Sequence, residues 1–214
     1  MSKSSTPVDA ELFAFVASRT IAEDDFLRDL RRAAAAAGLP EIHIAPEQAA
    51  FLRIALQAAR AKTVVEVGTL GGYSAIAMAR ALPDDGRVIT LELEPLHARF
   101  AREWIARSDQ AGKIEVIVGD AMATMPRLAD ESADAVFLDA DKERYVDYLR
   151  QSMRILRRGG SLFADNVLAD GEIARGDSPK VRALREFVDA AHATPDLRSV
   201  IVPLGDGCLF GVKR

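Results

Sequence analysis

From Lys62 onward, short apolar runs rich in β-branched residues alternate with longer stretches of helical patterning. Such runs form buried strands, and strands that alternate with helices build a parallel sheet covered on both faces. The strands are expected at 63–67, 88–91, 114–118, 135–138 and 161–164, and the helices at 73–82, 95–108, 121–128 and 144–156. The pattern therefore predicts a doubly wound α/β fold.

The two ends of the chain extend this core. After it we expect a helix at 179–193 and strands at 197–203 and 208–212, joined by a glycine-rich turn. Before it the patterning is helical, at 8–17, 22–37 and 46–60, and a stop at Gly38 is typical of a helix end. No linker rich in Pro, Gly or Ser divides the chain, so we expect a single domain, 1–214. Residues 1–60 would form an N-terminal helical extension and 61–214 the core.

Composition excludes several classes of protein. Hydrophobic residues make up 49% and charged residues 28%, as in globular rather than disordered proteins. No apolar run approaches the ~20 residues of a membrane span. A formal net charge of −4 argues against a nucleic-acid surface, which is normally basic. The start lacks an apolar signal region and the single cysteine, Cys208, has no internal disulfide partner, so we expect a cytoplasmic protein.

The first expected strand ends in a glycine-rich loop, Glu66-Val-Gly-Thr-Leu-Gly-Gly-Tyr-Ser74. In open α/β sheets, ligands bind beyond the carboxyl ends of the strands, and glycines there let the backbone approach a ligand closely. A dinucleotide fingerprint would need Gly-x-Gly-x-x-Gly, but Leu70 stands where its second glycine belongs. The loop alone is also compatible with a simple tight turn between strand and helix.

Two acids favour a nucleoside cofactor as the ligand. Glu66 lies inside an otherwise apolar strand, where a buried charge is costly without a partner. Glu92 directly follows the second apolar run, at the position from which a carboxylate accepts hydrogen bonds from ribose hydroxyls. Glu94 lies on the same strand face and is the alternative to Glu92. The missing glycine argues against a pyrophosphate.

The fourth and fifth strands both end in oxygen donors. Asp139 follows the fourth, and Asp165 and Asn166 follow the fifth. Adjacent parallel strands would bring these side chains together at the ligand edge of the sheet. Two carboxylates and an amide suit a hard cation, Mg²⁺ before Ca²⁺ or Mn²⁺. Acids at strand ends can also be ordinary solvated loop residues. The combination of acids at the ends of two neighbouring strands, with Lys142 nearby, favours a metal site.

Three segments resemble the cation-dependent class I O-methyltransferases, a family that includes catechol and caffeoyl-CoA O-methyltransferases and small bacterial relatives. The segments are the loop 66–74, Leu138-Asp-Ala-Asp-Lys-Glu-Arg-Tyr145 and Asp165-Asn-Val-Leu168. The resemblance extends from about residue 44 to the end. It implies a Rossmann-like, seven-stranded sheet with an antiparallel last strand, S-adenosylmethionine as cofactor, and a homodimer.

The resemblance also implies roles for individual residues. It assigns a divalent cation to Asp139, Asp165 and Asn166, and it puts Lys142 in the position of the family's catalytic lysine. Lys142 would take a proton from the acceptor hydroxyl, whose oxygen would then attack the sulfonium methyl group. The cofactor contacts implied are Glu66, Gly68, Thr69, Ser74, Glu92 (ribose), Ala121 (adenine), Asp139 and Asp141.

The expected acceptor is a small phenolic molecule with neighbouring hydroxyl groups, and neither nucleic acid nor a membrane is an expected partner. Ala169-Asp170 stands where many relatives carry a tryptophan that walls the acceptor pocket, so the sequence does not identify the acceptor. Two other functions stay open. One is a nicotinamide-dependent oxidoreductase on the same kind of sheet, and the other is a non-catalytic dimeric scaffold with a vestigial cofactor site.

Several further side chains are expected to be structural. Those expected to pack or to face solvent are His43, His97, His192, Tyr145 and Tyr148. Arg154, Arg157 and Arg158 are expected at the end of a helix, where positive charge suits the helix dipole.

Overall fold

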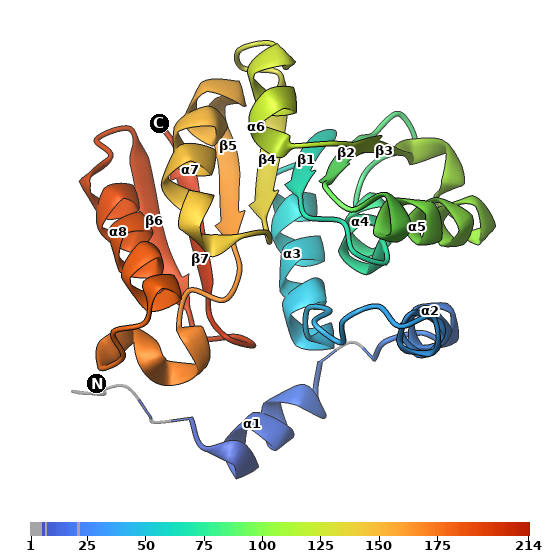
Figure 1. Ribbon diagram of the computed structural model, residues 1–214, viewed down its shortest axis with the longest axis horizontal. Coiled ribbons are helices and arrows are strands. Elements are labelled where there is room, and N and C mark those ends of the chain that lie inside the picture. Colours follow the sequence, from blue (N-terminus) through green and yellow to red (C-terminus); the bar gives the residue numbers. More distant parts are fainter. Residues whose placement is uncertain (1–5, 7, 21) are drawn as a thin grey trace.

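The computed structural model describes residues 6, 8–20 and 22–214 of the chain. Seven strands form one sheet in the order β3-β2-β1-β4-β5-β7-β6 (Figure 1). Strand β7 is antiparallel to both of its neighbours, and the remaining pairs are parallel. The strands are β1 Thr63–Val67, β2 Arg87–Glu92, β3 Ile114–Val118, β4 Ala133–Leu138, β5 Leu156–Ala164, β6 Leu197–Val202 and β7 Cys208–Lys213. The predicted seven-stranded, doubly wound α/β sheet with an antiparallel last strand is confirmed.

The helices start where capping residues predict. Asp24 and Ser178 accept hydrogen bonds from the first turns of α2 and α8, and prolines occupy the first turns of α3, α5 and α8. The α-helices are α1 Ala10–Ala17, α2 Asp25–Ala36, α3 Pro46–Ala58, α4 Tyr73–Ala79, α5 Pro95–Arg107, α6 Ala121–Thr124, α7 Tyr145–Ile155 and α8 Pro179–Ala193. Short 3₁₀ helices lie at Ala111–Lys113, Met125–Arg127, Lys142–Arg144 and Ala169–Ala174. Among the described residues, none of the helices combines the length and apolarity needed to cross a membrane.

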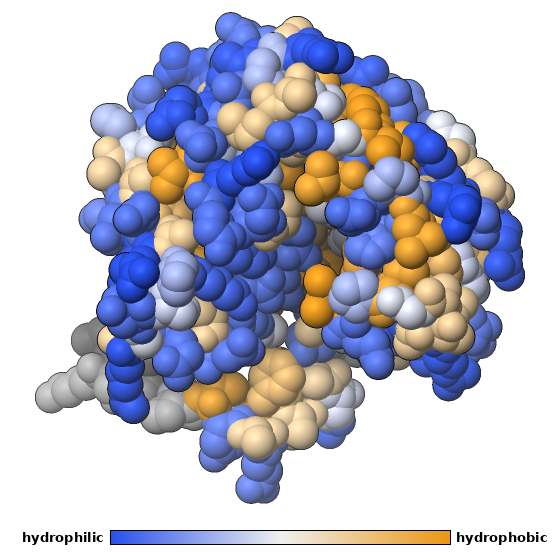
Figure 2. Space-filling model, in the orientation of Figure 1, coloured by the Kyte–Doolittle hydropathy of each residue, from blue (hydrophilic) through white to orange (hydrophobic). Residues whose placement is uncertain are grey.

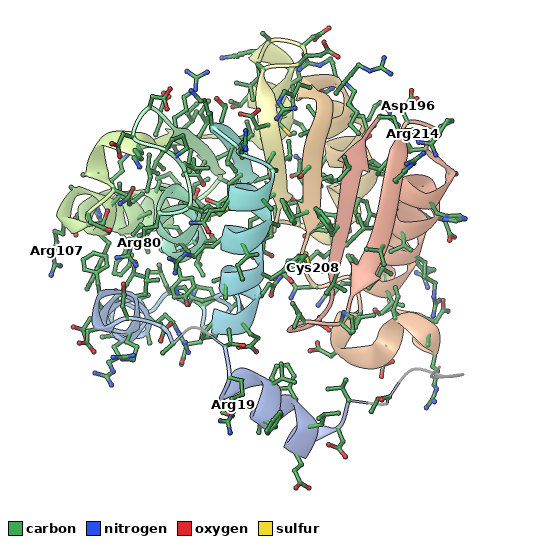
Figure 3. The ribbon with its side chains drawn as sticks, turned by 180° about the vertical axis from the view of Figure 1, so that it is seen from behind. Arg19, Arg80, Arg107, Asp196, Cys208 and Arg214 are labelled. Carbon is green, nitrogen blue, oxygen red and sulfur yellow. The ribbon has the colours of Figure 1, made fainter. Side chains whose placement is uncertain are left out.

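The sheet separates two apolar cores. Helices α2 to α5 pack on one face, and α6 to α8 pack on the other. Figure 3 shows the molecule from behind and brings α3 to the front, whereas α7 and α8 lie in front in Figure 1. Successive strand residues alternate between the cores because side chains along a strand point to opposite faces. Val64 thus packs under α3 and α4, and Val65 packs toward α7.

The same alternation decides on which face the acids lie. Asp139 and Asp165 follow Phe137 and Phe163 by two residues, so they continue the face that packs against α3. Glu66 lies on this face as well, inside β1. The acids predicted to bind ligands therefore gather between the sheet and the N-terminal helices.

The N-terminal helices are attached to the core to different degrees. Arg80, labelled in Figure 3, ties α2 to α4 through an ion pair of 2.6 Å with Asp24, and it also pairs with Asp109 at 2.9 Å. Helix α1, by contrast, has no buried residue and lies apart from the sheet in Figure 1. Phe15 in α1 is 58% exposed, and hydrophobic residues show on this part of the surface in Figure 2.

Several boundaries differ from their predictions, most of all the start of β5. Strand β5 begins at Leu156, directly after α7, so Arg157 and Arg158 lie in a strand and not at a helix end. Ala133 pairs with Leu156 but Ala135 pairs with Ser161, which shows that residues 157–160 bulge out of the β4–β5 ladder. The glycines at 159 and 160 belong to this bulge and do not precede the strand.

Candidate functional site

Two cavities open at the carboxyl edge of the parallel strands, and Asp139 lines both. The first, of about 380 Å³, lies against the glycine loop and includes Ser74, Glu92, Ala121 and Asp141 in its wall. The second, of about 480 Å³, lies beyond the ends of β4 and β5 and includes Gln48, Lys142, Asp165, Asn166 and Asp206. Residues 42–44 and 139–140 border both cavities. Ligands in the two cavities would therefore meet at this boundary.

The backbone geometry of the glycine loop requires a glycine at position 68. Its φ is +97°, and a Cβ there would lie 2.0 Å from the carbonyl oxygen of Asp139. Only glycine allows β1 to turn this close to the end of β4. Gly68 thereby brings the loop and Asp139 together at the boundary between the cavities.

Glu92 fixes the shape of this loop. Its Oε2 accepts hydrogen bonds from the backbone of Thr69 at 3.0 Å and of Leu70 at 2.7 Å, and its Oε1 accepts one from Glu94 at 2.9 Å. Oε1 accepts only one of these bonds, so it keeps acceptor capacity for a ligand in the first cavity. Glu92 is buried and Glu94 is exposed, and both line the first cavity.

Glu66 is fully buried at the base of the loop. Burial raises its pKa to about 8, against the nearby hydroxyl groups of Ser74 and Thr90, which favour the ionised form. Its Oε2 accepts the Thr90 hydroxyl at 2.5 Å, and Thr90 lies 2.5 Å from the Thr69 hydroxyl. Its Oε1 has no hydrogen-bond partner. Glu66 does not itself line either cavity, although the following residues Val67 and Gly68 line the first. An unpartnered buried oxygen directly behind these residues fits a ligand that carries a donor or a positive charge.

The far wall of the first cavity carries Ala121 and Asp141. Asp141 accepts a hydrogen bond from the Tyr148 hydroxyl at 2.6 Å, and Arg144 lies 3.3 Å from it. Arg144 also binds Asp120 at 2.9 Å, which caps the helix that Ala121 begins. Tyr148 was predicted to pack, and it does so while also orienting Asp141.

The predicted metal ligands come together as expected. The backbone of Asp165 donates to the carbonyl of Leu138 at 2.9 Å, so Asp139 and Asp165 begin at neighbouring strand ends. Asn166 has a φ of +58°, a left-handed conformation that asparagine tolerates. In the part of the chain that the structure describes, no three Asp, Glu, His or Cys side chains gather for a metal. The set here is two carboxylates and one amide.

The electrostatics of this set fit a cation. Burial, followed by the charge of Asp139, raises the pKa of Asp165 to about 6, and burial also raises the pKa of Asp139. Two neighbouring carboxylates at one site disfavour each other's ionised form unless positive charge lies close to them. Lys142 supplies positive charge at this site, because its Nζ lies 3.2 Å from Asp139 Oδ1. A dication would favour both ionised forms, and the donor set of three hard oxygens suits Mg²⁺.

Lys142 is held by more than Asp139. Its Nζ donates to the Tyr145 hydroxyl at 2.5 Å, and the carbonyl of Asp165 lies at 3.5 Å. Tyr145 is fully buried, packs against Phe187 at 5.1 Å between ring centroids, and donates to the carbonyl of Leu138 at 3.1 Å. Tyr145 was predicted to pack, at a position close to the expected metal site, and its hydroxyl also fixes the lysine.

Two histidines also line the first cavity, although they were predicted as packing or surface residues. His43 borders both cavities, and its buried Nε2 has no hydrogen-bond partner. Burial, followed by the charge of Arg31, lowers the pKa of His43 to about 4, so the ring is neutral at neutral pH. His97 Nδ1 lies 3.7 Å from Glu92. His43 lies in an irregular segment, where no periodicity indicates what a side chain faces.

The fold and the site together define a Rossmann-like α/β protein with two adjoining cavities at the carboxyl edge of the sheet. The chain belongs to the O-methyltransferase family, whose family model matches residues 17–214. The predicted resemblance to class I O-methyltransferases is thus confirmed. Family membership favours methyl transfer over the oxidoreductase and scaffold alternatives.

The chain is similar to named relatives and to solved structures of this family. It is 41% identical to a catechol O-methyltransferase of Niastella koreensis over 170 residues, 77% of each chain. It is 38% identical to a catechol O-methyltransferase of Mycobacterium tuberculosis over 203 residues, 94% of this chain and 91% of that one. The structure matches an O-methyltransferase from Bacillus cereus in complex with SAH with a TM-score of 0.87, at 31% identity, covering 95% of this chain and 97% of that one.

Proposed function

We propose that the chain transfers the methyl group of S-adenosylmethionine to one hydroxyl of a catechol-like, vicinal dihydroxy aromatic molecule, and that the transfer depends on a divalent cation. The observation that carries this proposal is the meeting of two cavities at Asp139. One is lined by the glycine loop and Glu92, and the other by the remaining proposed metal ligands and Lys142. The relatives named catechol O-methyltransferase and the solved relative with SAH support it.

The first cavity would hold the cofactor. Glu92 would accept the ribose hydroxyls, the small side chain of Ala121 would leave room for the adenine, and Asp141 would contact the cofactor beside it. The remaining contacts, to the methionine end, are Glu66, Gly68, Thr69, Ser74 and Asp139. A sulfonium and an ammonium group are positive, so the free oxygen of Glu66 and the carboxylate of Asp139 are suitable partners.

The second cavity would hold the acceptor. Asp139, Asp165 and Asn166 would bind the cation, which when bound lowers the pKa of an acceptor hydroxyl. Lys142, in its neutral form, would take the hydroxyl proton onto Nζ. The acceptor oxygen would then attack the methyl carbon, the sulfur–methyl bond would break toward sulfur, and the products would be a methyl ether and S-adenosylhomocysteine. Holding both partners at the boundary of the cavities would supply the orientation that the attack requires.

The outer wall of the second cavity is polar. Ala169-Asp170 stands where many relatives carry a tryptophan, and the backbone of Asp170 donates to Asp206 Oδ1 at 2.7 Å. Lys180 lies in the same wall. The acceptor would therefore be bounded on this side by charged groups and not by an aromatic ring.

The test is methyl transfer to a panel of small catechols in the presence of S-adenosylmethionine and Mg²⁺, with products read by mass spectrometry. Vicinal dihydroxy compounds should gain one methyl group, and matched monohydroxy compounds should not. Calorimetric titration should show binding of S-adenosylmethionine and none of NAD. Binding of NAD, or a panel without any methylated product, would contradict the proposal.

A further inference from the structure

We propose that Gln48 is a positioning residue for the cation site, holding one carboxylate oxygen of Asp165 so that the other oxygen is presented to the cation. The inference rests on the proposed function, because it assumes that Asp165 binds a cation. Gln48 belongs to α3 in the N-terminal extension, and Asp165 follows β5 in the core. The extension would thus take part in forming the cation site as well as in covering the sheet.

The contact itself is direct and buried. Gln48 is 1% exposed, and its Nε2 donates to Asp165 Oδ1 at 2.6 Å. The backbone of Asn166 donates to the same oxygen at 2.6 Å. Two donors on Oδ1 leave Oδ2 as the oxygen with free acceptor positions. The arrangement therefore distinguishes the two oxygens of Asp165 before any cation binds.

Regular secondary structure holds both partners in register. Gln48 and Phe51 lie three residues apart, on one face of α3. Phe163 lies in β5 and Asp165 directly follows this strand, two residues further on, so both point to the same side of the sheet. The rings of Phe51 and Phe163 pack edge to face, with centroids 6.2 Å apart. The aromatic contact and the hydrogen bond thus form two successive contacts between one helix and one strand end. A ligand held by such elements keeps its geometry better than one held by a loop.

A third element closes over the carboxamide of Gln48. A Cβ on Gly205 would lie 2.8 Å from Gln48 Oε1, so the turn containing Gly205 packs directly on this group. Gly205 has a φ of +56° and lies in the loop between β6 and β7. The carboxamide is therefore enclosed between Asp165 and this turn, which limits its rotation away from the carboxylate.

Gln48→Met tests the proposal, because methionine has a similar length and shape but no donor. The readout is the affinity for Mn²⁺, followed by the electron paramagnetic resonance signal of free Mn²⁺ at fixed pH, without cofactor or acceptor. The dissociation constant should rise about 10- to 100-fold, the usual effect of removing a group that supports a metal ligand. Gln57→Met is the matched control, since Gln57 is exposed on the same helix, and it should bind Mn²⁺ as the wild type does.

Two further readouts separate positioning from a general loss of structure. The affinity for S-adenosylhomocysteine should stay unchanged in Gln48→Met, because Gln48 does not line the first cavity. In turnover, the Mg²⁺ concentration for half-maximal rate should rise, while kcat at saturating Mg²⁺ should stay close to the wild-type value. Gln48→Asn keeps the amide but is one methylene too short to reach Asp165, and it should weaken Mn²⁺ binding as well.

Each remaining outcome counts against a defined claim. If Gln48→Met or Gln48→Asn binds Mn²⁺ as tightly as the wild type, Gln48 does not position Asp165. If either variant loses S-adenosylhomocysteine and Mn²⁺ binding together, the role of Gln48 is structural and the proposal is wrong. If the wild type itself binds no Mn²⁺, the cation dependence in the proposed function fails first, and the positioning role fails with it.

Discussion

Glu66 makes the stability of the fold depend on pH in an unusual direction. The carboxyl group is fully buried, and burial raises its pKa from 4.5 to about 8 in the folded state. At neutral pH the folded protein therefore holds a proton that the unfolded chain has released. The stabilisation linked to this proton is complete below about pH 4.5 and is lost as the pH rises toward 8.

The magnitude follows from the separation of the two pKa values. Between pH 5.5 and 7.5, Glu66 is almost fully ionised in the unfolded chain and mostly protonated in the folded one. Its contribution to the free energy of unfolding should fall by about 2 to 3 kcal/mol over this interval. Gln is a neutral isostere and does not titrate. Glu66→Gln should therefore gain this amount relative to the wild type as the pH rises.

Urea unfolding of both proteins at pH 5.5 and 7.5, without cation or cofactor, measures the effect. Glu94→Gln is the control, because Glu94 is exposed and its removal should leave the pH dependence unchanged. If the wild type and Glu66→Gln change in parallel with pH, Glu66 does not carry a raised pKa.

Three further substitutions test the site. Gly68→Ala should lower the free energy of unfolding by about 1 to 3 kcal/mol in chemical denaturation, because its Cβ would meet the Asp139 carbonyl at a positive φ. Gly112→Ala is the control, because the space around Gly112 is open. Equal stabilities of the two variants would contradict the structural requirement for Gly68. Lys142→Met should lower kcat by about 10²- to 10⁴-fold with S-adenosylhomocysteine affinity retained, and a wild-type rate would remove the lysine from the chemistry. Tyr145→Phe removes the hydroxyl 2.5 Å from Lys142 and should lower kcat about tenfold in steady-state kinetics, whereas an unchanged kcat would show that packing alone holds the lysine.

The fold was predictable because its strands are short apolar runs, and the central ones are buried on both faces. Thr63–Val67 and Ile114–Val118 have the predicted bounds, since polar or glycine residues flank each apolar run. The start of β5 was not predictable in the same way. Its bulge places charged residues and two glycines inside the strand, and such residues normally indicate its end.

The acids of the site were predictable from topology. In a parallel sheet, carboxylates that follow the strands must gather at one edge, which brings Glu92, Asp139 and Asp165 together. The contacts that orient them were not predictable, because they join residues distant in sequence. Gln48 and Asp165 are 117 residues apart, and helical periodicity shows that Gln48 is on a helix but not what it faces.

The sequence around some residues of the site indicates only a structural role for them. Tyr145 stands at the start of a helix and packs as an aromatic residue would, so no sequence pattern indicates that its hydroxyl contacts Lys142. Glu92 was predicted to accept ribose hydroxyls, but the backbone hydrogen bonds that shape the glycine loop become visible only in three dimensions.

The dependence of methyl transfer on free Mg²⁺ tests the central claim most directly. The rate with S-adenosylmethionine and a catechol is measured in excess EDTA and then across a Mg²⁺ titration, for the wild type and for Asp165→Ala. We expect no turnover in EDTA, recovery of the wild type as Mg²⁺ is added, and little or no recovery of the variant. Full activity of the wild type in excess EDTA, or of Asp165→Ala at any Mg²⁺ concentration, would contradict the claim.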